Sequence, residues 1–371
     1  MSRAPHTLVI TNDFPPRDGG IQTFVYELVS RLDPSMVTVL ASSYPGDAEF
    51  DQTLDFRVVR AQTQTLLPTQ NTTRLARQLV AETGATRVLF GAAAPLALMS
   101  PQLRRLGVKQ IVAMSHGHEA GWALTPGTRA LLKRIGSSAD VVTYLGDYTR
   151  NKIGRVFDKQ SRNAMRRLAP AVDPEVFTPA NKNAATELIS RLMKRKGQDQ
   201  LIKVMPGIVK RIPNAHLVIV GGGSFEERLR KLASASPVAQ HITFTGKVPY
   251  DELPLWYAGA DIFAMPCRTR NAGWDVEGLG IVYLEASASG IPVIAGDSGG
   301  APDAVLEGET GFVINGQSLI EIEDAIVKVL TDQSLAHSLG RRGREWVLSD
   351  WTWEHAVKRL NDLLDGRDPD A

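Results

Sequence analysis

The chain has 371 residues, enough for two hydrophobic cores, and its hydrophobic share of 43% is ordinary for a soluble globular protein. The net charge at pH 7 is +2, and the single cysteine, Cys267, excludes an internal disulfide and a cysteine-based metal cluster and favours a reducing cytoplasm. The most apolar stretch, residues 88–99, is too short to span a bilayer, and the N-terminus lacks the apolar core of a signal peptide, so we expect neither a membrane-spanning nor a secreted protein.

The charge is unevenly distributed along the chain. Residues 1–170 hold 21 Lys and Arg against 13 Asp and Glu, whereas residues 171–371 hold 21 against 27. Within residues 60–167 there are 17 basic and 5 acidic residues, an excess of 12. This excess indicates contact with a polyanion, either an anionic membrane surface or a nucleic acid, and a merely solvated basic surface explains it equally well.

The first predicted strand, residues 7–11, leads into a loop with two prolines and two glycines. The prolines keep residues 12–20 out of a helix, and apolar residues at helical spacing predict a helix from Ile21. A strand, a loop ending in Gly19-Gly20 and a helix can form a nest of main-chain amides that binds phosphate. A plain tight turn is the alternative for this stretch taken by itself.

Strands and helices alternate through the rest of the N-terminal half, which predicts an open parallel α/β sheet with ligands at the carboxyl ends of its strands. His116 and His118 follow the strand 110–114, where a histidine can bind a ligand or only support the loop. Zinc is not expected, because the pair lies in a glycine-containing loop without a supporting cysteine. The other strands predicted in this half are residues 37–41, 56–59, 88–90 and 141–144, and the helices are residues 72–83 and 127–136.

A second unit follows a linker marked by three prolines, residues 170–179. The segment 188–191 and the basic run 194–197 precede a predicted helix, residues 198–209, and cations there either bind an anion or form a solvated loop. The next strand, residues 217–220, ends in three glycines. The other elements predicted in this half are a helix at residues 226–233 and strands at residues 242–245, 262–265 and 292–295.

Glu277 and Glu285 stand eight positions apart, separated by two glycines and an apolar run. We expect a helix to begin after Gly280, with Glu277 on the loop before it and Glu285 about one turn inside. Free amides at a helix N-terminus attract anions, so an acid on either side of them suits a nucleotide-sugar, with the diphosphate on the amides and the hydroxyls on the acids. The competing interpretation is an acidic helix start that only favours the helix dipole.

The last predicted element is an amphipathic helix, residues 351–364, which either covers a seam of the core or crosses back to the N-terminal half. We expect residues 366–371 to form a frayed tail. The predicted domains are residues 1–170, residues 171–350, and the C-terminal helix and tail, residues 351–371.

Taken together, these stretches resemble the family-4 retaining glycosyltransferases, which have the GT-B fold: α/β, with two Rossmann-like domains whose parallel sheets face a central cleft. The resemblance covers essentially the whole chain. Within the family, the stretches 12–22, 261–270 and 275–286 are most similar to the actinobacterial phosphatidylinositol-monomannoside mannosyltransferases. The matching pieces are Gly19-Gly20, His118, Ser190-Arg191, Arg195-Lys196-Gly197, Gly221-Gly222-Gly223, Glu277 with Glu285, and residues 290–295 and 298–302.

The resemblance implies transfer of mannose from GDP-mannose to the inositol 6-position of a phosphatidylinositol monomannoside, with retention of configuration. It implies no cofactor and no metal, because this architecture needs no Asp-x-Asp motif. It also implies peripheral binding at the cytoplasmic face of the plasma membrane, for which the basic region 60–167 is an independent reason. Nothing in the sequence matches a nucleic-acid-binding module, so we expect a membrane as the polyanion.

The family's donor-binding roles fall on matching positions of this chain. Arg191 and Lys196 would neutralise the leaving diphosphate, and Gly19 and Gly20 would close on it. Glu285 would hold the ribose hydroxyls. The remaining donor-binding positions are Gly222, Val248, whose main chain would read the base, and Leu279, Gly280 and Ile281, where the diphosphate would sit.

Three residues take the catalytic roles that the resemblance implies. Glu277 would hold hydroxyls of the donor sugar, and His118 would touch the transferred mannose near the reacting carbon. Asp13, at the end of the first strand, is the candidate for orienting the acceptor hydroxyl.

The chain departs from the family in two places: the segment 178–190 is short, and the usual proline before the Lys196-Gly197 pair is absent. Three alternatives remain: a transferase that makes another glycolipid, a non-catalytic lipid- or nucleotide-binding relative, and a nucleotide-sugar epimerase of the same architecture. A transfer assay separates them.

Overall fold

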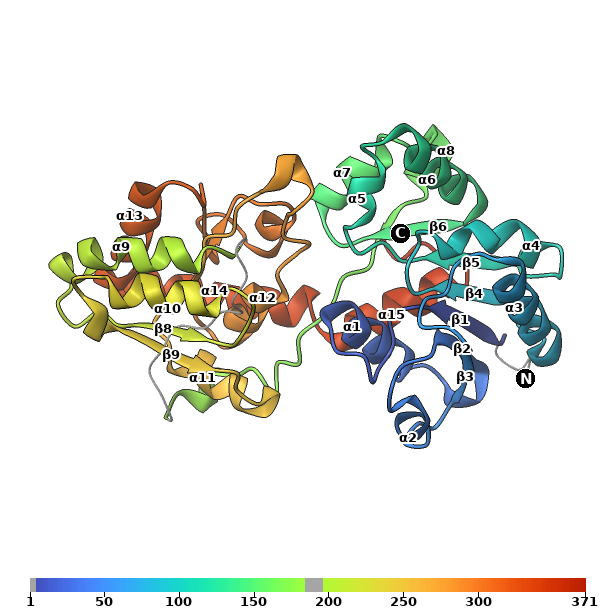
Figure 1. The fold of residues 1–371 in the computed structure, drawn as a ribbon, viewed down its shortest axis with the longest axis horizontal. Helices are drawn as coiled ribbons and strands as arrows, with labels where there is room; N and C mark the ends of the chain where they lie inside the picture. The colour runs from blue at the N-terminus through green and yellow to red at the C-terminus, as the bar shows by residue number, and fades with distance from the viewer. Residues whose placement is uncertain (1–4, 184–195) are drawn as a thin grey trace. The chain divides into compact units, whose positions relative to one another are not determined.

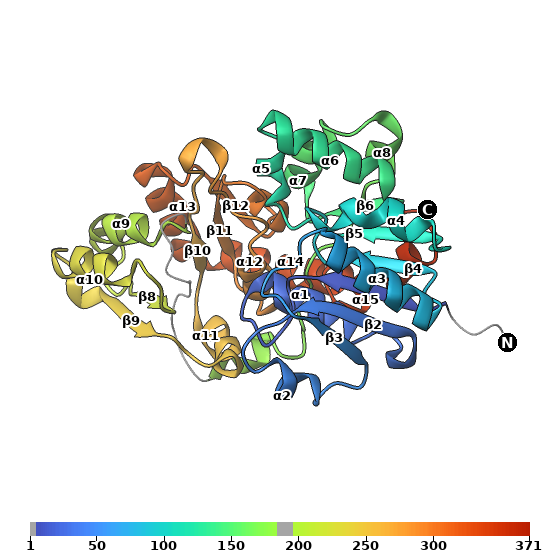
Figure 2. The same ribbon diagram turned by 45° about the vertical axis from the view of Figure 1, so that its right-hand side comes forward.

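The computed structural model describes residues 5–183 and 196–371. The chain divides into two compact units. Unit 1 takes in the chain up to Pro170 together with Trp353–Ala371, and unit 2 takes in Ala171–Thr352. The chain therefore leaves unit 1 once and returns to it for its last helix, drawn in red among the blue and cyan elements of Figures 1 and 2.

Unit 1 is built on a sheet that has seven strands within the described residues, in the order β3-β2-β1-β4-β5-β6-β7. Neighbouring strands run parallel, so the predicted open parallel sheet is confirmed. Because the strands are parallel, their carboxyl ends share one edge of the sheet. The strands are β1 (Thr7–Thr11), β2 (Val37–Ser42), β3 (Arg57–Ala61), β4 (Arg87–Phe90), β5 (Gln110–Ala113), β6 (Val141–Tyr144) and β7 (Arg166–Arg167).

Helices cover both faces of this sheet, because alternate apolar side chains of the central strands point to opposite faces. On one face, Leu8 and Ile10 of β1 pack in a core with Leu79 and Leu132. On the other, α1 packs against α15, which also contacts β4 and β5. The helices of unit 1 are α1 (Gly20–Val29), α2 (Asp47–Asp51), α3 (Gln70–Thr83), α4 (Ser100–Arg104), α5 (Glu119–Trp122), α6 (Pro126–Ser138), α7 (Asp147–Gly154), α8 (Lys159–Asn163) and α15 (Trp353–Leu364).

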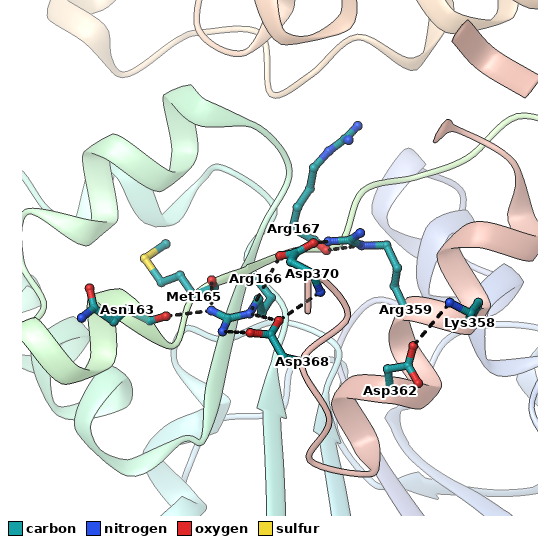
Figure 3. Close-up of polar contacts among 9 residues, drawn as sticks. All are labelled: Asn163, Met165, Arg166, Arg167, Lys358, Arg359, Asp362, Asp368 and Asp370. Atoms are coloured by element: carbon teal, nitrogen blue, oxygen red, sulfur yellow. Dashed lines mark hydrogen bonds and ion pairs between the residues drawn. The ribbon is translucent and has the colours of Figure 1, made fainter. Parts of the chain in front are cut away.

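The C-terminal helix α15 buries the apolar face that its sequence pattern predicted. The prediction of a frayed tail after it is wrong. Just before the tail, Arg87 pairs with Asp365 at 2.7 Å. Within the tail, Asp368 pairs with Arg166 at 2.6 Å, as Figure 3 shows. Partners more than 200 positions away hold this segment, which contains no large apolar side chain.

Unit 2 has the same α/β pattern. Strands β8 and β9 pair in parallel, and β10, β11 and β12 form a second parallel group. Side chains of both groups, among them Leu217, Ala264 and Ile294, share one core with α9 and α13. The segment 188–191 lies outside the described residues. The strands are β8 (Leu217–Val220), β9 (Ile242–Gly246), β10 (Phe263–Met265), β11 (Val293–Gly296) and β12 (Gly311–Ile314).

Two helices of unit 2 begin at side-chain caps. Ser318 accepts a hydrogen bond from the amide of Glu321, and Asp332 accepts one from the amide of Leu335 at 2.9 Å. The helices of unit 2 are α9 (Gln198–Arg211), α10 (Glu226–Ser234), α11 (Leu253–Gly259), α12 (Ile281–Ala288), α13 (Leu319–Thr331) and α14 (Gln333–Asp350). In the part of the chain that the structure describes, no helix combines the length and apolar composition that crossing a membrane requires.

Candidate active site

The loop after β1 brings Asp13, Gly19 and Gly20 to the carboxyl edge of the unit 1 sheet. Asp13 is half-buried, and its carboxylate accepts a hydrogen bond from Gln22 Nε2 at 2.6 Å. Its main-chain amide donates to Thr11 Oγ1 at 2.9 Å. Gly19 is the residue before α1, and Gly20 is exposed at its start. The predicted order of strand, glycine-containing loop and helix is confirmed.

The loop after β5 is held by a buried carboxylate. Glu119 is fully buried, and its Oε2 accepts hydrogen bonds from Ser115 Oγ at 3.0 Å and from the amide of His116 at 3.1 Å. Its other oxygen, Oε1, lies 3.3 Å from Nε2 of His118, whose side chain is 44% exposed. His116 is buried, and its Nε2 contacts the carbonyl oxygen of Gly91. The buried Glu119 carboxylate therefore lies beside the His118 ring, which is partly exposed to solvent.

Asp13 and the histidine loop lie near each other because β1, β4 and β5 are neighbours in the sheet. The amide of Gly91, just after β4, donates to Ile10 of β1 at 2.9 Å, and its carbonyl meets His116. Burial lowers the pKa of His116, and the carboxylates of Glu119 and Asp13 act against this shift. Unit 1 thus gathers an acid, a histidine with an exposed ring and two glycines at one edge of its sheet.

Acidification is expected to destabilise unit 1 through His116. Because burial lowers its folded-state pKa from 6.5, the unfolded chain takes up the proton first, and stability is lost as the pH falls below 6.5. The free energy of unfolding, measured with a denaturant at about pH 7.5 and about pH 5.5, should fall less between these pH values for His116→Gln than for the wild type.

His337→Gln, which changes an exposed histidine of α14, is the matched control and should leave that loss unchanged. An equal loss in His116→Gln and in the wild type would contradict the assignment to His116.

In unit 2, α12 begins at Ile281, directly after Gly280, as predicted. Gly280 has φ 83°, and a Cβ there would come 2.5 Å from the ring of Tyr283, so only glycine is accommodated. Tyr283 is fully buried, and its hydroxyl donates to the carbonyl of Met265, the last residue of β10, at 2.7 Å. The start of α12 is thereby fixed at the carboxyl end of β10, with Leu279 buried beneath it.

Glu277 lies on the loop before α12, at the carboxyl ends of β10 and β11. The residue is 7% exposed, and its carbonyl accepts a hydrogen bond from the amide of Gly300 at 2.9 Å. Burial raises the pKa of the Cys267 thiol to about 11, with a smaller contribution in the same direction from Glu277. Burial also raises the pKa of Tyr283, again with a smaller contribution from Glu277. Glu277 is therefore near both groups.

Glu285 has different surroundings, one turn inside α12 as predicted. It is 8% exposed, and its Oε2 accepts a hydrogen bond from the hydroxyl of Tyr257 on α11 at 2.8 Å. The Tyr257 ring packs against Phe263 of β10, with 5.6 Å between ring centroids. Glu285 is thus held by Tyr257, whereas Glu277 lies near Cys267 and Tyr283.

Lys196 is 6% exposed and precedes Gly197, the residue before α9. Gly197 has φ 84°, and a Cβ there would come 2.2 Å from the carbonyl oxygen of Pro266, just after β10. This close approach places Lys196 at the same strand ends as the α12 start. Arg191, its predicted companion, lies outside the described residues.

Gly222 and Val248 follow β8 and β9 at the carboxyl end of that pair. The amide of Gly221 donates to the carbonyl of Gly246 at 2.8 Å, which joins the two loops. The side chain of Lys247 lies against Gly222. Both predicted positions therefore lie at the edge of unit 2 where ligands of parallel sheets bind.

Some residues that shape these sites were not predicted from the sequence. Glu119 and Tyr257 are buried partners of His118 and Glu285, and Arg268 Nη2 binds both oxygens of Asp199 at 2.9 and 2.8 Å. A carboxylate directly after a histidine was the one local signal, for Glu119. Among the described residues, no group of three His, Cys, Asp or Glu side chains is arranged to hold a metal ion.

Two parallel α/β units with glycine-containing strand-to-helix junctions are typical of the GT-B fold, and the predicted α/β fold class is confirmed. A glycosyltransferase from Rickettsia africae superposes with a TM-score of 0.78 at 16% identity, covering 98% of this chain and 99% of that one. Anabaena Alr3699/HepE in complex with UDP superposes with a TM-score of 0.79 at 15% identity, covering 97% and 100%.

Sequence comparison identifies the family. The model of glycosyl transferases group 1 matches residues 176–346. The GDP-mannose-dependent alpha-(1-6)-phosphatidylinositol monomannoside mannosyltransferase of Mycobacterium tuberculosis is 46% identical over 388 residues, covering 99% of this chain and 99% of that protein. The chain belongs to the family of these mannosyltransferases, and its residues 176–346 match the group 1 glycosyl transferase model.

Proposed function

We propose that this protein transfers mannose from GDP-mannose to the inositol 6-position of phosphatidylinositol monomannoside, forming an alpha-(1-6)-linked dimannoside. The observation that carries the proposal is the 46% identity, across 99% of both chains, to a mannosyltransferase named for this donor, acceptor and linkage. Two buried acids, Glu277 before α12 and Glu285 inside it, support donor binding at this edge of unit 2.

In this proposal unit 2 binds the donor. The diphosphate sits on residues 279–281, where the amides at the start of α12 face an anion, and Lys196 with Arg191 neutralises it. Glu285 accepts hydrogen bonds from the ribose hydroxyls and Glu277 from hydroxyls of mannose. Gly222 and the main chain at Val248 contact the nucleotide, with Val248 reading the base.

Unit 1 supplies the groups that act at the reacting carbon. His118, oriented by Glu119, contacts the transferred mannose, Asp13 orients the acceptor hydroxyl, and Gly19-Gly20 closes on the diphosphate. As the bond from the anomeric carbon to the phosphate oxygen breaks, negative charge grows on the diphosphate, and fixed cations and amides stabilise it. The acceptor oxygen bonds to the same face of the sugar and its proton passes to the leaving phosphate, so configuration is retained without a protein base or a metal.

The protein is proposed to act in the cytoplasm, bound peripherally to the inner face of the plasma membrane, where its lipid acceptor lies. The basic excess in residues 60–167 supports attraction to anionic head groups. Binding to anionic vesicles should therefore weaken as the salt concentration rises.

Radiolabelled GDP-mannose incubated with the protein, a panel of lipid acceptors and EDTA tests the proposal. Label is expected in the phosphatidylinositol monomannoside reaction and absent from reactions with unrelated glycolipids. Label in another lipid would point to a different glycolipid product, and no labelled lipid under any acceptor would refute the transferase proposal.

A further inference from the structure

The acidic C-terminal tail of unit 1 is held by two arginines whose guanidinium groups are already fixed by the main chain (Figure 3). Nη1 of Arg166 donates to the carbonyl oxygens of Asn163 at 2.7 Å and of Met165 at 2.9 Å. Nε of Arg359 donates to the carbonyl oxygen of Arg167 at 3.1 Å. Each guanidinium therefore keeps its position through main-chain bonds that do not involve the tail.

Both arginines also bind tail carboxylates, through two nitrogens of Arg166 and one of Arg359. Nε and Nη2 of Arg166 bind the two oxygens of Asp368 at 2.7 and 2.6 Å, the paired geometry by which arginine also binds phosphate. Nη2 of Arg359 binds Asp370. Arg166 is 22% exposed, whereas Asp368 and Asp370 are 40% and 48% exposed. The arginines are the fixed partners and the carboxylates are the ones within easy reach of water.

The position of these arginines fits a ligand site. Arg166 and Arg167 form β7, which pairs with Thr143 and Tyr144 at the carboxyl end of β6. The histidine loop lies at this same edge of the sheet. Arg166 and Arg167 belong to the basic region 60–167. Arg150 lies over the ring of Tyr144, 5.6 Å from its centroid, and adds a further cation.

We propose that Arg166 and Arg359 form a binding site for the phosphate of an anionic membrane lipid, which the tail carboxylates of Asp368 and Asp370 occupy in its absence. The tail then competes with the membrane for the same two guanidinium groups and weakens membrane attachment until it is displaced. The inference rests on the proposed function, because that function requires contact with a lipid surface.

The test uses the full-length double variant Asp368→Asn/Asp370→Asn, which keeps the volume of both side chains. Co-sedimentation is measured with vesicles of phosphatidylcholine alone and of phosphatidylcholine mixed with phosphatidylinositol in equal amounts. Freeing two arginines at a lipid surface is expected to raise affinity for the mixed vesicles about tenfold, with no gain on neutral vesicles.

The matched control is Glu49→Gln/Asp55→Asn, which adds the same charge to exposed positions of unit 1 away from the tail. Adding Arg166→Gln to the tail variant should remove its gain. A tail variant that gains no more than the control, or a gain that survives Arg166→Gln, would overturn the proposal. A gain for duplex RNA without one for vesicles would overturn the assignment to lipid.

Mannose transfer measured on the same proteins separates this inference from the proposed function. If the wild type transfers mannose but the tail variant binds vesicles no better than the wild type, only the inference about the tail is refuted. If the tail variant binds anionic vesicles more tightly but no mannose is transferred, only the proposed function is refuted.

Discussion

Replacing Lys196 with alanine is expected to lower turnover with GDP-mannose about a hundredfold to a thousandfold, the usual effect of losing one group that stabilises charge in a transition state. Lys196 is buried at the carboxyl end of β10, where the start of α12 also lies. The loss should appear in kcat, because the negative charge on the diphosphate grows as the bond to mannose breaks. Steady-state kinetics with saturating acceptor measures it.

The control is Lys210→Ala, which removes an exposed lysine from the last turn of α9. It should leave turnover unchanged, and the melting temperature of Lys196→Ala should show that unit 2 still folds. Near-normal turnover of Lys196→Ala would remove this lysine from the donor site.

Replacing Gly197 with alanine is expected to destabilise unit 2 by about 3 kcal/mol or more, because two costs combine. The left-handed conformation, φ 84°, disfavours any residue with a Cβ, and that Cβ would come 2.2 Å from the carbonyl oxygen of Pro266. Main chain must move to relieve the contact, and Lys196 must move with it. The free energy of unfolding, measured with a denaturant, and the turnover of the same protein should both be reduced.

Gly308→Ala separates the two costs. Gly308 also has a left-handed conformation, φ 73°, but a Cβ there would have no atom within 4 Å beyond its own chain neighbours. The free energy of unfolding of Gly308→Ala should fall by only about 1 kcal/mol, the cost of the backbone conformation. Equal losses for the two variants would mean that the contact with Pro266 contributes nothing.

Much of the fold could be predicted because its signals are local. Short runs rich in apolar residues located β1, β8 and β9, and the glycine before Ile281 located the start of α12. Such signals arise within a few residues, from burial of a strand or from the conformation that only glycine adopts. The order of the strands in the unit 1 sheet is not local, and the sequence did not predict it.

The candidate site was predictable to a similar extent. Residues on loops after strands, such as Asp13 and His118, followed from the rule that parallel sheets bind ligands at the carboxyl ends of their strands. The partner that holds Glu285 did not follow, because the bond between Tyr257 and Glu285 joins residues 28 positions apart. The tail was mispredicted for the same reason: Arg166 lies 202 positions from Asp368.

The donor, the acceptor and the new bond together define the proposed reaction. NMR of the purified lipid product, made from GDP-mannose and phosphatidylinositol monomannoside, tests all three at once. A single added mannose, alpha-linked to the 6-position of inositol, is the expected product. A beta linkage, attachment at another position, or product formed only from a different nucleotide-sugar would contradict it.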